Sequence, residues 1–349
     1  MKNTRLPARP KVRINSHTIM LLITIVLFIA LYGAGCVMYA NKDFGKLQNF
    51  LNVLINNAGL LVAACGVTCV MLAGGIDISV GSMVALTCMF MSVGLAEWGL
   101  PSGVLIALIL LIGIVFGCVQ GFCIAYLEIQ PFIVSMAGLF FARGMTAVIS
   151  TEQVSVPFDS WFGKLSQIKI EMPFQIGAYL NKKGVLMVPY VRITVVVALL
   201  VVLITFLMLR YTKFGRALYA VGGNQQSAAL MGLNVKKTKM LSHVLCSFYA
   251  TIGGLCFCLN TMCGTATQAT GLEMDAISSA VIGGTLLTGG VGNVIGTLFG
   301  VMINGTISSL VKFNGKLVAS WANIITAILL CFFIVLQAVF AKIKERNSK

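Results

Sequence analysis

Apolar runs of about twenty residues recur along the whole chain and are separated by short polar stretches. A helix of about twenty apolar residues crosses the hydrocarbon core of a bilayer, whereas membrane β-strands give shorter segments that alternate in polarity. The pattern therefore predicts an all-α polytopic membrane protein with about ten transmembrane helices, some of them short or broken. We expect spans at residues 18–39, 51–73, 80–96, 104–126, 132–150, 191–209, 241–262 and 276–288, a ninth before Lys312 and a tenth from Trp321.

The composition excludes a soluble globule, because 58% of the 349 residues are hydrophobic, 10% are charged and the mean hydropathy is +0.96. The net charge of +15 does not indicate a nucleic-acid partner, since the basic residues are not clustered on a soluble face. The eleven cysteines lie in apolar runs or at the end of one. None has the spacing of metal ligands, so we interpret them as packing residues and expect no metal site.

Two segments that are rich in Lys and Arg and free of acids mark the cytosolic side, residues 1–17 and 210–239. An even number of spans then places both termini in the cytosol. The predicted organisation is a basic N-terminus at 1–17, a transmembrane domain at 18–341 and a tail at 342–349. Within the domain we expect an external loop at 151–190 and a cytosolic loop at 210–240.

The stretch from Ala73 to Met83 interrupts the apolar pattern with a carboxylate, Asp77, among glycines and serines. An ionisable group between two membrane segments is costly and is usually functional or placed at a turn that reaches water. The alternative is a short cytosolic turn with Asp77 as a helix cap. Ser79 and Ser82 can also cap the helix that follows.

Other polar residues fall inside predicted spans. Arg143 lies near the middle of the fifth span and needs a partner or a wet cavity; we favour a structural ion pair. Asn57 either packs helices together or lines a path, and we favour packing. Gly113, Gly117 and Gly121 form a four-residue repeat that predicts close approach of another helix.

The basic segment 210–239 contains a short predicted helix. Asn224 is a suitable N-cap and Gly232 a suitable stop, which gives about two turns. A helix this short is unstable alone in water, so it must dock on the membrane domain or on a cytosolic partner. Its residues are Asn224, Gln225, Gln226, Ser227, Ala228, Ala229, Leu230, Met231 and Gly232. The glycine-rich stretch 283–300 is not a phosphate loop, because no Gly-Lys-Ser/Thr follows it; we expect short, closely packed helices there.

Four stretches, in order, resemble the permease subunits of ribose/galactose-type ABC sugar importers. They are Gly-Gly-Ile-Asp-Ile-Ser-Val-Gly-Ser (74–82), Pro-Phe-Ile-Val-Ser-Met-Ala-Gly (131–138), Phe-Gly-Arg-Ala-Leu-Tyr-Ala-Val-Gly-Gly-Asn (214–224) and Glu-Met-Asp-Ala-Ile-Ser-Ser-Ala-Val-Ile-Gly-Gly-Thr (273–285). The resemblance extends over about residues 20–340. Residues 149–152, 283–292 and 296–301 are most similar to the galactofuranose-type permease.

The resemblance implies a multi-pass subunit of a bacterial cytoplasmic membrane that translocates a monosaccharide. It implies three partners besides the lipid bilayer: an ABC ATPase subunit, a second and different permease, and an extracytoplasmic sugar-binding protein. Residues 224–232 would be the coupling helix inserted into the ATPase. ATP would be bound by that partner, so we expect neither a cofactor nor catalysis in this chain.

Neutral sugars are held by hydrogen bonds, so we expect the path to be lined by Asn57, Asp77, Ser79 and Asn260. A different class of function is an ion-coupled secondary transporter, with Asp77 and Arg143 as the coupling charges. The single basic cytosolic loop at 210–240 and the lack of a second acid within the membrane argue against a secondary transporter. An intramembrane enzyme is disfavoured, because no histidine or acid pair lies within a span.

Overall fold

The computed structural model describes residues 16–173, 176–180 and 186–346. Helices dominate this part of the chain, which confirms the predicted fold class. Eight of the described helices are long and apolar enough to cross a membrane. They are α1 (Ser16–Met38), α2 (Leu47–Leu72), α4 (Ser102–Ala125), α5 (Pro131–Ile149), α7 (Ile193–Tyr211), α10 (Val235–Thr261), α12 (Val294–Asn314) and α13 (Ser320–Arg346).

Of the two remaining predicted spans, the one at 80–96 forms a helix with those bounds, at the lower limit of length for crossing a bilayer, whereas the one at 276–288 forms a helix too short to cross. The helix α3 (Val80–Ala96) has 17 residues and α11 (Leu272–Ile282) has 11, or about 25 and 16 Å of helix. The predicted span 276–288 is therefore wrong in extent. The helix α11 ends at Gly283, and Gly284 turns the chain away with a φ of 92°.

The remaining helices are short. They are η1 (Ala40–Lys42), α6 (Trp161–Gln167), α8 (Lys213–Gly223) and α9 (Gln225–Leu230). The segment predicted as a cytosolic loop at 210–240 contains α9, which matches the short helix predicted at 224–232, and α8, which was not predicted. Helix α10 begins at Val235, six residues earlier than the span predicted from hydropathy. A helix can continue through polar residues beyond its apolar segment, and a hydropathy profile does not detect that extension.

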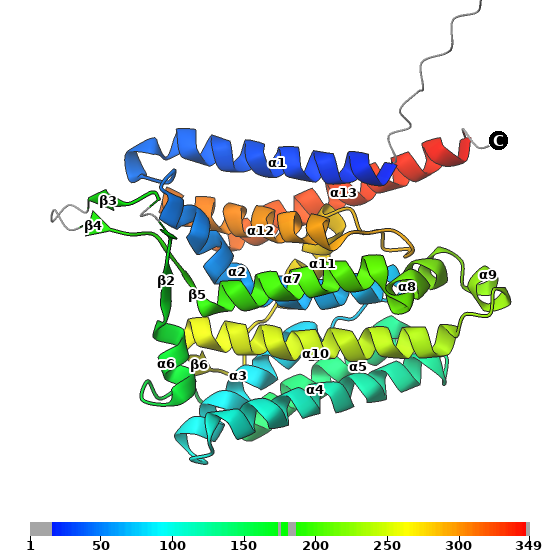
Figure 1. Ribbon diagram of the computed structural model, residues 1–349, viewed down its shortest axis with the longest axis horizontal. Coiled ribbons are helices and arrows are strands. Elements are labelled where there is room, and N and C mark those ends of the chain that lie inside the picture. The colour runs from blue at the N-terminus through cyan, green and yellow to red at the C-terminus, as the bar shows by residue number, and fades with distance from the viewer. Residues whose placement is uncertain (1–15, 174–175, 181–185, 347–349) are drawn as a thin grey trace, which may run out of the picture.

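The bundle has two distinct ends (Figure 1). The start of α1, the end of α13, and helices α8 and α9 lie together at what we name the α9 end. Helix α6 and the short strands lie at the opposite α6 end. This arrangement fits an even number of crossings. That the α9 end faces the cytosol remains a prediction from the charge pattern, and residues 1–15 and 347–349 lie outside the described residues.

The connection between α5 and α7, where an external loop is expected at 151–190, contains α6 and small antiparallel pairs of strands. Strand β1 (Val154–Ser155) pairs with β6 (Cys263–Gly264), with Val154 opposite Gly264. Strand β2 (Lys169–Glu171) pairs with β5 (Tyr190–Arg192), and β3 (Tyr179–Leu180) with β4 (Leu186–Met187). The N-cap of α6 is Ser160, whose Oγ accepts from the Gly163 amide.

Helices α2, α3 and α10 form the centre of the bundle, and α2 and α3 are buried over almost their whole length. The predicted close approach at Gly113, Gly117 and Gly121 is confirmed, because a Cβ at each would collide with α10. Most cysteines are buried and all are free, which fits their interpretation as packing residues.

Candidate functional site

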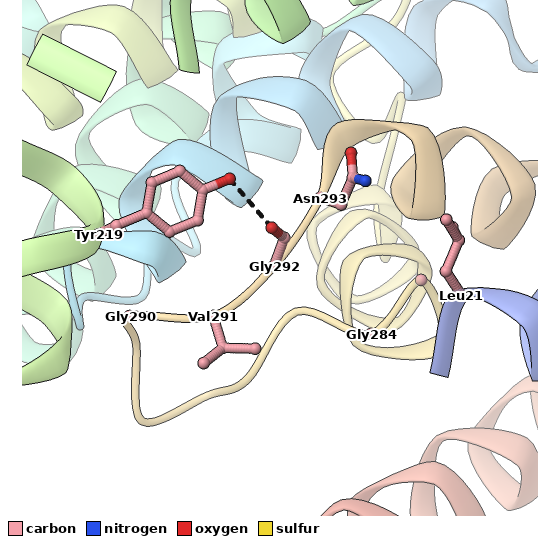
Figure 2. A pocket seen from close by; sticks show the side chains of 8 residues that line it. Leu21, Tyr219, Gly284, Gly290, Val291, Gly292 and Asn293 are labelled. Carbon is pink, nitrogen blue, oxygen red and sulfur yellow. Dashed lines mark hydrogen bonds between the residues drawn. The ribbon is translucent and has the colours of Figure 1, made fainter. Parts of the chain in front are cut away.

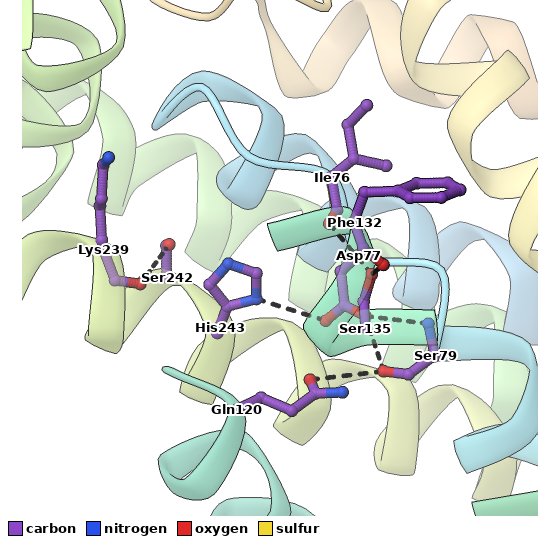
Figure 3. A network of polar contacts seen from close by, with 9 residues as sticks. All are labelled: Ile76, Asp77, Ser79, Gln120, Phe132, Ser135, Lys239, Ser242 and His243. Atoms are coloured by element: carbon purple, nitrogen blue, oxygen red, sulfur yellow. Dashed lines mark hydrogen bonds and ion pairs between the residues drawn. The ribbon is translucent and has the colours of Figure 1, made fainter. Parts of the chain in front are cut away.

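Asp77 is at the centre of a buried polar cluster in the break between α2 and α3 (Figure 3). The carboxylate is fully buried, and its Oδ1 accepts from the Ser79 amide (2.9 Å) and from Ser79 Oγ (2.6 Å). Its Oδ2 lies 3.6 Å from His243 Nδ1 of α10. Gln120 of α4 and Ser135 of α5 complete the cluster. The break is thereby tied to three other helices.

The capping roles expected for these residues are wrong. Ser79 precedes α3, but its side chain caps no α3 amide, because its hydroxyl donates to Asp77 instead. Ser82 Oγ donates to the carbonyl of Ser79 (2.7 Å). Asp77 therefore holds the irregular backbone of the break in shape and does not cap α3.

We expect Asp77→Leu to destabilise the protein by about 3–5 kcal/mol, the usual cost of removing one partner of a buried pair. Asp77→Asn should cost less, because it keeps an oxygen acceptor for Ser79. Thermal unfolding in detergent measures both. Asp43→Asn is the control, since Asp43 is 62% exposed beside Lys46 and should matter by less than about 1 kcal/mol. An Asp77→Leu protein as stable as wild type would contradict the bracing role, and normal uptake by Asp77→Asn would remove the charge from the mechanism.

The structure does not bring the four proposed path residues together. Asn57 Nδ2 donates to the Val53 carbonyl (2.7 Å) and packs against Gly305 of α12. Asn260 Nδ2 donates to the Ile55 carbonyl of α2 (2.6 Å). Along α2, Asn57 is about 22 Å from the end that leads to Asp77 and Ser79. Both asparagines therefore make packing contacts toward the α6 end.

The short helix α9 has the predicted caps. Asn224 Oδ1 accepts from the Ser227 amide (2.8 Å), and Gly232 stops the helix with a φ of 81°. One side of the helix is anchored, because Ala228 is fully buried in a small apolar cluster with α8 and α10. The other side presents Leu230, 90% exposed, and Met231, 69% exposed.

A glycine junction connects this region to the core. The carbonyl of Leu72, the last residue of α2, accepts from the Gly290 amide (3.0 Å). Gly222, at the end of α8, lies so close that a Cβ there would overlap the Leu72 carbonyl. The backbones of α2, α8 and the glycine-rich loop after α11 therefore meet directly, next to the break that contains Asp77.

A pocket of about 280 Å³ adjoins this junction (Figure 2). Tyr219 of α8 donates its hydroxyl to the Gly292 carbonyl at 3.0 Å. Burial raises the pKa of Tyr219 to about 12, so the phenol stays protonated and remains a donor. Leu21 of α1 and Asn293 line the other side. The contact fixes the glycine-rich loop against α8.

Arg143 does not form the predicted ion pair: among the described residues no carboxylate lies within 4 Å of its guanidinium. Its Nη1 donates to the carbonyls of Ala266 (3.1 Å) and Gln268 (2.6 Å). These belong to residues 262–271, the connection between α10 and α11, which we name the re-entrant segment for its position inside the bundle. Its carbonyls are free to accept because the segment is not helical.

Sequence reasoning missed Gln120, Ser135 and His243 as partners of Asp77. Gln120 carried a signal, since an amide inside an apolar span requires a hydrogen-bonding partner. His243 falls at the start of the span expected at 241–262, where a histidine gives no sign of a buried partner; it is buried because α10 begins earlier, at Val235.

Comparison with known proteins assigns the chain to a class. A family model described as "Branched-chain amino acid transport system / permease component" matches residues 49–334. The chain belongs to this family of permeases. It is accordingly a multi-pass membrane protein and a transport-system component.

The permease is similar along most of its length to curated bacterial proteins. It is 38% identical over 317 residues, 91% of each chain, to the inner membrane ABC transporter permease protein YjfF of Escherichia coli (strain K12). It is 32% identical over 326 residues, covering 93% of this chain and 92% of the relative, to the fructose import permease protein FruG of Bifidobacterium longum (strain NCC 2705). To the ribose import permease protein RbsC of Escherichia coli (strain K12) it is 31% identical over 297 residues, 82% and 84% of the two chains. No solved structure matches the chain significantly.

Proposed function

We propose that the chain is the transmembrane permease subunit of an ABC importer for a monosaccharide. The sugar is delivered by an extracytoplasmic binding protein, and ATP hydrolysis in a separate subunit drives alternating exposure of a central path. The observation that carries this proposal is α9, an anchored two-turn helix whose apolar side faces outward at Leu230 and Met231. Exposed apolar residues of this kind are typical of a docking site.

The relatives favour a sugar as the substrate class, since FruG and RbsC are import permeases for fructose and ribose. Within that class we propose galactofuranose, on the likeness of residues 149–152, 283–292 and 296–301 to the galactofuranose-type permease. We further propose that this chain pairs with a second, different permease in a bacterial cytoplasmic membrane. The α9 end would face the cytosol, in agreement with exposed Arg210, Lys213 and Lys236 there.

An ion-coupled secondary transporter is the second class of function. It would need coupling charges that change partners during transport. Asp77 is enclosed by Ser79 and His243, and Arg143 is held by backbone carbonyls, so neither is arranged as a carboxylate–guanidinium pair. The geometry therefore favours the ATP-driven importer.

ATP hydrolysis by the reconstituted complex tests the proposal. The chain is placed in nanodiscs with its candidate ATPase and sister permease, and the binding protein is added empty or loaded with galactofuranose, ribose, galactose or fructose. We expect one loaded binding protein to stimulate hydrolysis severalfold over the empty protein. An assembled complex that no loaded protein stimulates, together with uptake that requires an ion gradient, would contradict it.

A further inference from the structure

The re-entrant segment lies between the spans predicted at 241–262 and 276–288, and it runs from β6, on the side of α6, into the bundle (Figure 1). Gly264 contacts the backbone at Met89, near the middle of α3. Arg143, which binds the segment, is well inside α5. Asn304, at the middle of α12, donates to the Asp275 carbonyl near the start of α11 (3.3 Å). Beyond β6, the segment and the start of α11 are therefore at the depth of the bilayer interior.

The backbone of this segment is irregular. Met262 and Ala269 have φ values of 54° and 55°, and Gly271 has 88°. Irregular backbone at this depth is stable only where protein buries it or where it lines a water-filled cavity, because lipid cannot satisfy its polar groups. Which side chains of the segment are exposed decides whether protein buries the segment or the segment lines a cavity.

One side of the segment is fixed to the protein and the other is free. Gln268 is 8% exposed; its Oε1 accepts from the Thr265 amide (2.9 Å) and its Nε2 donates to Thr261 Oγ1 (3.0 Å). Thr267 and Thr270, in contrast, are exposed, and the Thr270 hydroxyl donates to the Thr267 carbonyl (2.7 Å). Two hydroxyl side chains thus project from an irregular backbone at a depth where lipid would otherwise be the solvent.

We infer that the free side of the re-entrant segment forms a wall of the translocation path. Thr267 would offer its hydroxyl to the substrate as donor and acceptor, and Thr270 would offer its oxygen as an acceptor. Arg143 would position the segment from behind. Thr hydroxyls both donate and accept, which suits the hydroxyl groups of a neutral sugar. The ligand class rests on the proposed function, whereas the assignment of the wall rests on depth and exposure alone.

Water access to this wall is tested by cysteine labelling of the assembled complex in nanodiscs, without any sugar. We expect Thr267→Cys and Thr270→Cys to react with a charged, membrane-impermeant thiol reagent above the background of the native cysteines. Leu200→Cys is the control, since Leu200 is 53% exposed at the middle of α7 and should face lipid without reacting. If both variants assemble and neither reacts, the wall assignment is wrong, whatever the substrate is.

The sugar contact is tested separately with Thr267→Val and Thr270→Val, which keep side-chain shape and remove the hydroxyl. We expect uptake per complex to fall about two- to tenfold, as for the loss of one hydrogen bond, while ATPase stimulation by the loaded binding protein is retained. Unchanged uptake in both variants and in the double variant would overturn the sugar contact. If the cysteine variants react but no sugar-loaded binding protein stimulates ATP hydrolysis, the wall assignment stands and the proposed substrate class is wrong.

Discussion

Leu230→Asp is expected to detach the ATPase subunit while leaving the permease folded. The side chain is 90% exposed, so the substitution removes no packing within this chain. Burying a leucine in a partner's groove contributes about 1.5–3 kcal/mol, and a carboxylate there adds a desolvation cost. The affinity for the ATPase should fall at least about ten- to hundredfold. Co-purification with the ATPase and ATP-driven uptake measure this loss.

Two controls make the result specific to α9. Leu186→Asp introduces the same change at the α6 end, where Leu186 is 50% exposed, and should leave ATPase binding intact. Ala229 is exposed and Ala228 is fully buried. We expect Ala229→Arg to uncouple transport without unfolding and Ala228→Arg to lower thermal stability. Normal uptake by both Leu230→Asp and Ala229→Arg would refute docking at this helix.

The local features of α9 were predictable because their signals are local. Asn224 and Gly232 bracket the helix by the chemistry of caps and stops, and neither depends on distant residues. The spans were predictable for a similar reason, since hydropathy over twenty residues reports the bilayer directly. The short helix α11 was not, because its apolar pattern continues past the glycines that end it.

The partners of the intramembrane charges were not predictable from the sequence. His243 lies 166 residues after Asp77, and only the packing of α10 on the α2–α3 break brings them together. Arg143 donates to the carbonyls of Ala266 and Gln268, and every residue has a carbonyl, so no residue type marks this contact. The depth of the re-entrant segment has the same origin, because it follows from contacts of the segment with α3 and α5 and of α11 with α12.

Gly222→Ala is expected to disrupt the glycine junction between α8 and the core. An added Cβ would overlap the Leu72 carbonyl and crowd the Gly290 amide that hydrogen-bonds to it. These neighbours are backbone atoms, so the clash is relieved only by moving α8 away from α2. Overpacking of this kind costs about 1–3 kcal/mol. We expect lower thermal stability and loss of most ATP-driven uptake, while the permease still binds its ATPase through α9.

Gly223→Ala is the matched control, because the same methyl group one residue later meets no atom within 4 Å. Gly223 is also the last residue of α8, where alanine is favoured over glycine in a helix by up to about 1 kcal/mol. Uptake and thermal unfolding of this variant should therefore match or exceed those of wild type. If Gly222→Ala behaved like Gly223→Ala in both measurements, the backbone contact at Leu72 would not transmit motion from α9. The connection would then have to run through α10, which follows α9 and contacts Asp77 through His243.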